Sequence, residues 1–184
     1  MKYNYLFLLF INSLYLMSYN GYAQEHHSEE HKAHEPFENH FRMSPVLSHT
    51  YIPKATSEGK RLSLVPSFGF DVEYWFSHKW GFGFHNDLEL ETFEVEDGHM
   101  STIEREFPFV TTLDVLHNFH KGWVLVLGAG IEFEKHKNLA VIRLGLEYEI
   151  EIGDDWDVAP TIFHDFRINS FNTASIGVGF GKRF

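Results

Sequence analysis

Residues 64–76 read Leu64-Val65-Pro66-Ser67-Phe68-Gly69-Phe70-Asp71-Val72-Glu73-Tyr74-Trp75-Phe76. From Leu64 to Phe76 every second residue is apolar, and most of the residues between them are small or acidic. Successive side chains of a β-strand point to opposite faces of the sheet. A period of two therefore predicts a strand with one apolar face and one polar face.

The same alternation recurs along the chain, and no helical period competes with it after residue 44. Turn-forming residues separate the repeats, as expected between antiparallel strands. The pattern predicts strands at 44–53, 62–76, 79–93, 103–117, 122–134, 138–151, 155–167 and 172–184. We therefore expect an all-β fold, an eight-stranded antiparallel up-and-down transmembrane β-barrel formed by residues 44–184.

Three features predict that the apolar face points outward, toward lipid. Glycines fall on the charged face, where a narrow lumen needs room for long side chains. Tight connections at 77–79 and 153–155 alternate with longer ones at 53–61 and 94–102, as in barrels with short periplasmic turns and longer outer loops. Aromatic residues cluster beside the tight turns, which predicts a girdle at the periplasmic boundary. That girdle would contain Tyr74, Phe76, Trp80, Trp123, Tyr148 and Trp156.

The N-terminal part of the chain has a different composition. Residues 1–23 combine Lys2, an apolar run and small residues before Gln24, which predicts a cleaved signal peptide. A membrane anchor is the alternative, but polar residues interrupt the run before it reaches about 18 apolar residues. Residues 24–43 are rich in His and Glu and poor in apolar residues, so we expect a disordered tether there.

Composition excludes several classes of function. The chain of 184 residues has 26 acidic and 15 basic residues, a formal charge of −11, which disfavours a nucleic-acid partner. It contains no cysteine, so disulfides, thiolate metal sites and cysteine nucleophiles are excluded. No spacing of Ser, His and carboxylate residues supports a nucleophile with its base and orienting group, so we expect no enzyme.

The chain resembles the small eight-stranded outer-membrane β-barrel proteins. The terminal Phe184, behind the alternating apolar residues of 172–184, resembles the C-terminal assembly signal of that family, although Lys182 departs from it. The segments 70–76, 85–90, 130–138 and 181–184 are most similar to uncharacterised barrels of Bacteroidetes-type bacteria. The resemblance implies a location in the outer membrane of a Gram-negative cell, contact with outer-membrane lipid, and insertion by the barrel-assembly machinery. It implies no substrate.

The predicted lumen holds many more acids than arginines. Fifteen Asp and Glu residues fall on the inward face of the predicted strands, against Arg143, Arg167 and Arg183. One interpretation is a filled polar plug of ion pairs, since barrels of this size leave no open channel. The other is that the surplus carboxylates face water at the mouths, share protons or bind a cation.

Two groups of residues are candidate ligands for a divalent metal cation. At the outer mouth, neighbouring strands would bring carboxylates beside an imidazole. This group contains Glu89, Glu91, Glu104, Glu106, Glu132, Glu134 and His136. In the tether, imidazoles could chelate a transition metal. This second group contains His26, His27, His31 and His34. A solvated acidic rim and a plain spacer are the alternatives.

The sequence thus predicts an integral outer-membrane barrel with a filled polar lumen and a structural or surface-interaction role. The alternative is a barrel that binds and handles divalent metal ions, with the tether and the acidic outer mouth as the binding sites. The predicted outer loops are short and polar, which disfavours adhesion without establishing metal binding.

Overall fold

The computed structural model describes residues 37–184, apart from 54, 58–59, 62–63 and 97–101. Residues 37–184 form a compact unit of their own. The predicted signal peptide, residues 1–23, lies outside the described residues, as does the predicted tether up to residue 36. No helix among the described residues is long and apolar enough to span a membrane.

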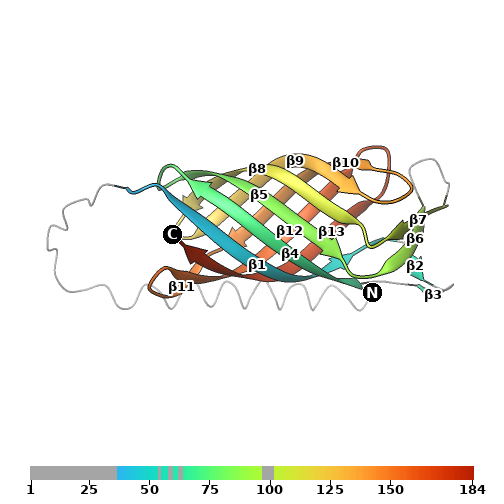
Figure 1. Ribbon diagram of the computed structural model, residues 1–184, viewed down its shortest axis with the longest axis horizontal. Coiled ribbons are helices and arrows are strands. Elements are labelled where there is room, and N and C mark those ends of the chain that lie inside the picture. The colour runs from blue at the N-terminus through green and yellow to red at the C-terminus, as the bar shows by residue number, and fades with distance from the viewer. Residues whose placement is uncertain (1–36, 54, 58–59, 62–63, 97–101) are drawn as a thin grey trace, which may run out of the picture. The chain divides into compact units, whose positions relative to one another are not determined.

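Eight long strands form a closed antiparallel barrel, as the alternation predicted (Figure 1). Each strand pairs with the next along the barrel, and the first pairs with the last over Arg42–Tyr51, which closes the sheet. The eight strands are β1 (His40–Tyr51), β4 (Leu64–Trp75), β5 (Trp80–Glu89), β8 (Phe109–His120), β9 (Trp123–Phe133), β10 (Leu139–Tyr148), β12 (Trp156–Arg167) and β13 (Asn172–Arg183). A short strand, β11 (Ile150–Gly153), continues β10 beside β12.

The outside of the barrel is apolar and the inside is charged, which confirms the predicted assignment of the two faces. Leu113 is 70% exposed and Leu47 61%, whereas Asp71 and Glu73 are buried. Alternating exposed and buried residues continue along β4 from Leu64 to Trp75. Such an exposed apolar surface is costly in water and is typical of a surface covered by lipid.

Aromatic rings cluster at the end of the barrel with the tight turns. Trp80 packs on His117 with ring centroids 4.1 Å apart, and Trp123 packs on Tyr148 at 4.6 Å. At this end Lys121 and Gly122 make a tight turn with φ angles of 34° and 84°. A Cβ on Gly122 would lie 2.6 Å from a backbone oxygen, so the turn depends on glycine.

The first strand begins earlier than predicted. Residues 40–43 were predicted to belong to the tether, whereas β1 starts at His40 and pairs there with Trp75. The reason is that Phe41 and Met43 continue the outward apolar face, and Arg42 between them is buried in the lumen. β1 therefore includes the four residues 40–43 that were predicted to end the tether.

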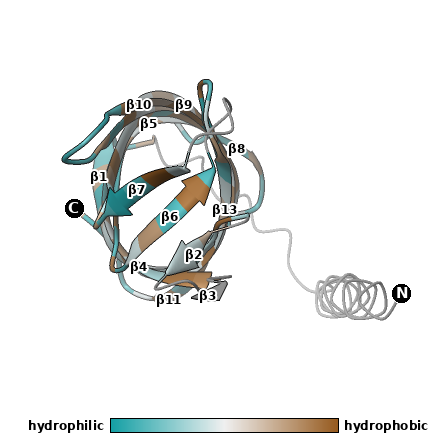
Figure 2. Cartoon of the chain, turned by 90° about the vertical axis from the view of Figure 1, so that its right-hand side faces the viewer, coloured by the Kyte–Doolittle hydropathy of each residue, from teal (hydrophilic) through white to brown (hydrophobic). Residues whose placement is uncertain are grey.

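The outer loops contain more structure than predicted. A second sheet forms beyond the barrel, in the order β3-β2-β6-β7. Its strands are β2 (Thr56–Ser57), β3 (Lys60–Arg61), β6 (Thr92–Glu96) and β7 (Thr102–Glu106). Phe93 and Val95 of β6 pack into a small apolar core with residues from four other segments of the outer end. We call this sheet the outer cap, because β6 and β7 lie across the end of the barrel (Figure 2).

The outer cap interrupts two strands that were predicted to be continuous. The predicted strand at 79–93 ends at Glu89, and the predicted strand at 103–117 divides into β7 and β8. Between β7 and β8, Phe107 has a φ of 45° and Pro108 cannot donate a ladder hydrogen bond. This break reverses the facing of β7, so that Glu104 and Glu106 are exposed and Arg105 is buried.

Candidate functional site

The lumen contains most of the buried charged side chains of the described residues, and it is therefore the candidate functional site. Among the described residues, eight carboxylates and four arginines are buried, together with one histidine, His85. Buried charges are stable only where they are paired or hydrogen-bonded. The buried carboxylates are Asp71, Glu73, Glu89, Asp114, Glu132, Glu147, Asp157 and Asp165, and the arginines are Arg42, Arg105, Arg143 and Arg167.

At the tight-turn end, Arg42 organises the lumen. Its guanidinium donates to both oxygens of Asp157, with Nη2 at 2.7 Å from Oδ1 and Nε at 3.0 Å from Oδ2. It also donates to Glu73, whose second oxygen accepts from the indole N–H of Trp75 at 2.8 Å. Arg42, Glu73 and Asp157 come from three different strands, so this group ties β1, β4 and β12 together.

In the middle of the barrel, Arg143 forms ion pairs with carboxylates of two other strands. It donates from Nε and Nη2 to the two oxygens of Asp165, each at 2.8 Å, which is a bidentate pair. Its Nη1 lies 2.7 Å from Asp87, which belongs to β5. Strands β10 and β5 are not neighbours in the sheet, so Arg143 reaches across the interior. Its guanidinium also lies 4.9 Å above the ring of Phe163.

At the outer end, two arginines share one carboxylate. Arg167 of β12 donates to Glu132, to Thr173 at 2.8 Å and to Glu89 at 3.3 Å. Arg105 of the outer cap donates to the other oxygen of Glu132. The outer cap is therefore joined to the barrel wall by buried ion pairs as well as by its apolar core.

Arg105 also holds the loop that follows β9. It donates to Glu134 at 3.2 Å and to the backbone oxygen of Lys137 at 2.6 Å. Burial acts to raise the pKa of Glu134, but the backbone N–H of His136, at 2.9 Å, and the Arg105 guanidinium outweigh it. The pKa of Glu134 consequently lies below its usual value.

The residues predicted to form a metal site at the outer mouth do not gather into one group. Glu89 and Glu132 form ion pairs with Arg167, and Glu91 is half-buried. Glu104 and Glu106 were expected to point inward, which is wrong, because β7 turns them to the outside. Glu106 lies instead 3.7 Å from Lys135.

His136 completes the predicted outer group. Its imidazole is half-exposed, and its Nδ1 lies 3.7 Å from Glu134, so these two predicted ligands do lie side by side. The predicted tether ligands, His26, His27, His31 and His34, lie outside the described residues. The metal sites predicted from the sequence therefore stay predictions.

Two buried, ion-paired arginines, Arg42 and Arg105, were not among the predicted lumen residues, and the sequence signals for them differ. Arg42 could have been found, because Phe41, Met43, Pro45 and Leu47 extend the period of two back to residue 41. Arg105 had no such local signal, since it stands between two glutamates in a continuous alternation. Only the proline at 108 marked a possible break in the strand.

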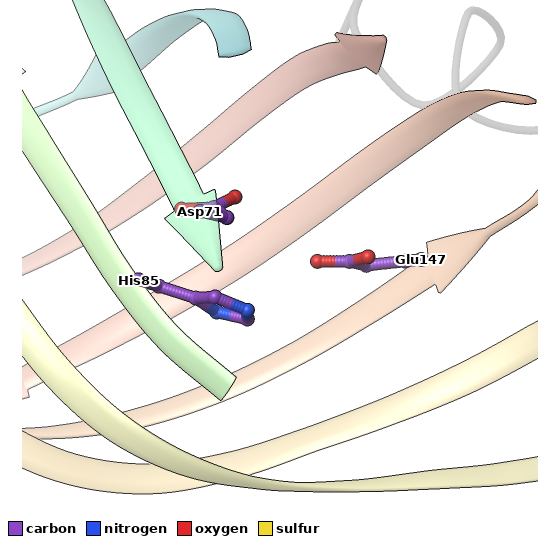
Figure 3. Close-up of side chains that lie close together, drawn as sticks. All are labelled: Asp71, His85 and Glu147. Atoms are coloured by element: carbon purple, nitrogen blue, oxygen red, sulfur yellow. The ribbon is translucent and has the colours of Figure 1, made fainter. Parts of the chain in front are cut away.

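One group of side chains in the described part of the chain has the arrangement of metal ligands. Asp71, His85 and Glu147 offer ligand atoms that lie within 4.8 Å of one another. They project from β4, β5 and β10 into the middle of the lumen (Figure 3). His85 belongs to the predicted strand at 79–93, but its association with Glu147 could not be predicted from the sequence, because that contact crosses the barrel.

Comparison with known proteins finds the fold but no family. No protein-family model matches the chain, and no curated protein sequence matches it. Among solved structures, the chain is similar to Ail, the attachment invasion locus protein of Yersinia pestis, crystallised with the heparin analogue sucrose octasulfate. The identity is 14%, the match covers 79% of this chain and 97% of Ail, and the TM-score is 0.51.

Neisserial surface protein A is similar to the same degree. Its identity to this chain is 10%, the match covers 78% of this chain and 97% of that protein, and the TM-score is 0.51. Identities this low carry information about the fold alone. Together with the closed sheet and the apolar exterior, they establish that this chain has the fold of the small eight-stranded outer-membrane β-barrels.

Proposed function

We propose that the protein is an integral outer-membrane barrel with a closed lumen, and that it has a structural or surface-interaction role rather than an enzymatic or pore-forming one. The observation that carries this proposal is the pair of ion contacts made across the interior, from Arg143 to Asp87 and from Arg167 to Glu89. Each joins strands that are not neighbours in the sheet. Ion pairs that cross the lumen in this way support its closure to solutes.

The membrane location is supported by the exterior of the barrel. Large apolar side chains cover all eight barrel strands on the outside, and Phe76, Trp80 and Trp156 are exposed at the tight-turn end. Aromatic belts of this kind stand at the membrane–water boundary of outer-membrane barrels. We propose that residues 1–23 direct export.

The C-terminal strand supports a proposed route of insertion. Phe184 is 66% exposed, and its backbone exchanges two hydrogen bonds with Phe41 at 2.9 and 3.2 Å. The side chain is thus presented at the seam where β13 meets β1. We propose that the barrel-assembly machinery recognises this end of the chain.

The buried ion pairs favour a lumen that stays closed over one that opens and closes. Opening a path requires several arginines to separate from the carboxylates with which they are paired, and breaking one buried pair costs about 3–5 kcal/mol. The closed barrel would serve as a rigid support for the outer cap, which presents Glu94, Glu96 and Glu104 to the exterior.

Conductance measurement tests this proposal. The purified full-length protein, folded in detergent and checked by heat-modifiable gel migration, is reconstituted in a planar lipid bilayer. We expect no stable conductance steps, whereas a sixteen-stranded porin in the same bilayer conducts, because its lumen is an aqueous channel. Stable steps from the wild-type protein, or swelling of proteoliposomes in a small sugar, would overturn the proposal.

Divalent-metal handling is a second candidate function, and the surplus of buried carboxylates over arginines favours it. In its predicted form it uses the tether histidines and the carboxylates of the outer mouth. Isothermal titration calorimetry with Zn²⁺ and with Ca²⁺ tests the tether. It compares the wild type with a variant in which His26, His27, His31 and His34 are replaced by Gln. Unchanged binding after these replacements would eliminate the tether as a metal site.

A further inference from the structure

We propose that Asp71, His85 and Glu147 form a binding site for one first-row divalent transition-metal ion in the middle of the lumen. This site is distinct from the tether and from the outer mouth, and it does not depend on whether the barrel conducts. The three residues come from β4, β5 and β10, and each is buried, with His85 fully so. Figure 3 shows their polar ends directed toward a common point.

The strongest support is the state of His85. Neither of its ring nitrogens has a hydrogen-bond partner, although both are buried. Nδ1 lies 3.4 Å from Asp114, without the geometry of a hydrogen bond. A buried polar atom with no partner costs about 1–3 kcal/mol, so such atoms are rare in folded proteins and call for a ligand, water or ion.

Asp71 and Glu147 make weaker contacts with arginines than the other buried carboxylates near them do. Among the described residues, Asp71 makes no ion pair, and its recorded contact is the backbone N–H of Asn86 at 3.3 Å. Glu147 lies 3.9 Å from Arg42, which is longer than a hydrogen bond. The nearby guanidiniums of Arg42 and Arg143 are instead paired with Asp157 and Asp165.

The surroundings supply further groups that suit a bound ion. Thr161 stands opposite Glu147 in the pairing of β10 and β12, and its buried hydroxyl has no partner. Asp114 Oδ2 lies 3.4 Å from Nδ1 of His85, so a small rotation of the imidazole would let this carboxylate accept a hydrogen bond from Nδ1–H. Metal-binding imidazoles commonly donate their second N–H to a carboxylate, which fixes the ring. Gly83 leaves space for the ring, since a Cβ there would lie 2.7 Å from Nε2.

Ligand chemistry selects the class of metal. One imidazole and two carboxylates suit Mn²⁺, Fe²⁺, Co²⁺ or Zn²⁺, whereas Ca²⁺ and Mg²⁺ prefer oxygen ligands alone. Two carboxylates neutralise a divalent cation in a lumen whose buried acids outnumber its arginines. Zinc bonds of about 2.0–2.2 Å bring ligand atoms closer together than the 4.8 Å limit seen here, so binding draws the three side chains inward by small rotations.

Glu147 lies one residue before the end of β10, at the tight-turn end of the barrel. A cavity of about 420 Å³ opens there, lined by Glu149, Glu151, Arg183 and neighbouring residues. Glu149 comes two residues after Glu147 on the same side of the sheet. The Arg42 guanidinium lies 3.9 Å from both of these carboxylates, so the way from this cavity to the site passes beside Arg42.

Metal stoichiometry tests the site. The full-length chain, with His26, His27, His31 and His34 replaced by Gln to silence the tether, is folded in detergent, stripped with EDTA and incubated with Zn²⁺. After gel filtration, we expect about one zinc per chain by mass spectrometry. Co²⁺ in place of Zn²⁺ should give the visible absorption of a nitrogen- and oxygen-ligated ion.

Three variants in this background identify the ligands. His85→Gln, Asp71→Asn and Glu147→Gln should each remove the bound zinc, and Asp114→Asn should lower the affinity roughly 10–100-fold. Glu106→Gln is the matched control, because it makes the same change of charge on the exposed face of the outer cap. It should retain the zinc.

The outcomes separate this site from the others. No bound zinc, or equal zinc in His85→Gln and in its parent, overturns the proposal. Loss of zinc in Glu106→Gln instead assigns binding to the outer mouth and also overturns it. Asp71→Asn and Glu147→Gln each relieve the surplus of buried negative charge, so they should fold even if His85→Gln does not. Heat-modifiable migration verifies folding for every variant.

Discussion

Replacing Arg42 by methionine tests the position of the first strand and the role of the ion pairs at once. If residues 40–43 belonged to a solvated tether, the substitution would change the free energy of unfolding by less than about 0.5 kcal/mol. In the structure, Arg42 is buried and makes hydrogen bonds to Glu73 and Asp157, which are themselves buried. Methionine fills similar space but leaves both carboxylates without their cation.

The structure sets the size of the effect. Removing one partner of a buried ion pair costs about 3–5 kcal/mol, because the other charge stays buried and unpaired. Arg183→Met is the matched control, since this arginine pairs with the exposed Glu151 at 2.8 Å. Pairs of that kind contribute about 0–1 kcal/mol. We therefore expect Arg42→Met to cost at least about 2 kcal/mol more than Arg183→Met.

Equilibrium unfolding in urea measures both variants. The protein is folded into phospholipid vesicles, and tryptophan fluorescence follows unfolding, with the urea dependence of the free energy compared between variants. Adding Glu73→Gln and Asp157→Asn to Arg42→Met should recover part of the loss, because neutral amides need no counter-ion. Equal costs for Arg42→Met and Arg183→Met would refute the burial of Arg42 and the start of β1 at His40.

Three further predictions concern the lipid face, the packing of the lumen and the outer loop. Leu144→Arg, in the middle of β10, should cost about 2–4 kcal/mol in vesicle unfolding, and Ile152→Arg beyond the end of that strand about 0–1 kcal/mol; equal costs would contradict the placement of the membrane. Gly145→Ala should destabilise by about 1–3 kcal/mol in the same assay, because the new Cβ would lie 2.2 Å from the Phe163 ring. The pKa of Glu134 is lowered, so its contribution to stability is complete above the unfolded pKa of about 4.3 and disappears as the pH falls through the lower folded value. Urea unfolding at pH values from about 3 to about 7 measures this contribution. The free energies of unfolding of the wild type and Glu134→Gln should differ most at high pH and converge at low pH.

The assignment of faces could be read from the sequence because it is a local property. Phe68 and Phe70 point outward and Asp71 and Glu73 inward, and the alternation along a single strand suffices to predict this. A shift of one residue would reverse every side chain, so the apolar pattern specifies the facing strongly. The number of barrel strands and their antiparallel order follow from the same pattern.

Element boundaries depended on features that the alternation alone does not contain. The sequence near residue 105 continues with a period of two, yet the break at Phe107 and Pro108 reverses the facing of β7. The outer cap forms because Phe93 and Val95 find apolar partners from distant loops. A local sequence pattern cannot predict such partners, because they become neighbours only when the barrel closes.

The chemistry of the lumen is likewise decided by closure of the sheet. Asp71 and His85 stand opposite each other in the register of the adjacent strands β4 and β5, so their proximity follows from the tight hairpin that joins these two strands. Glu147 joins them from the far wall, more than 60 residues away in the chain. Alternation determines that all three side chains point inward, but only the curvature and stagger of the closed sheet decide which inward residues meet, because these set the level and the distance at which opposite walls face each other.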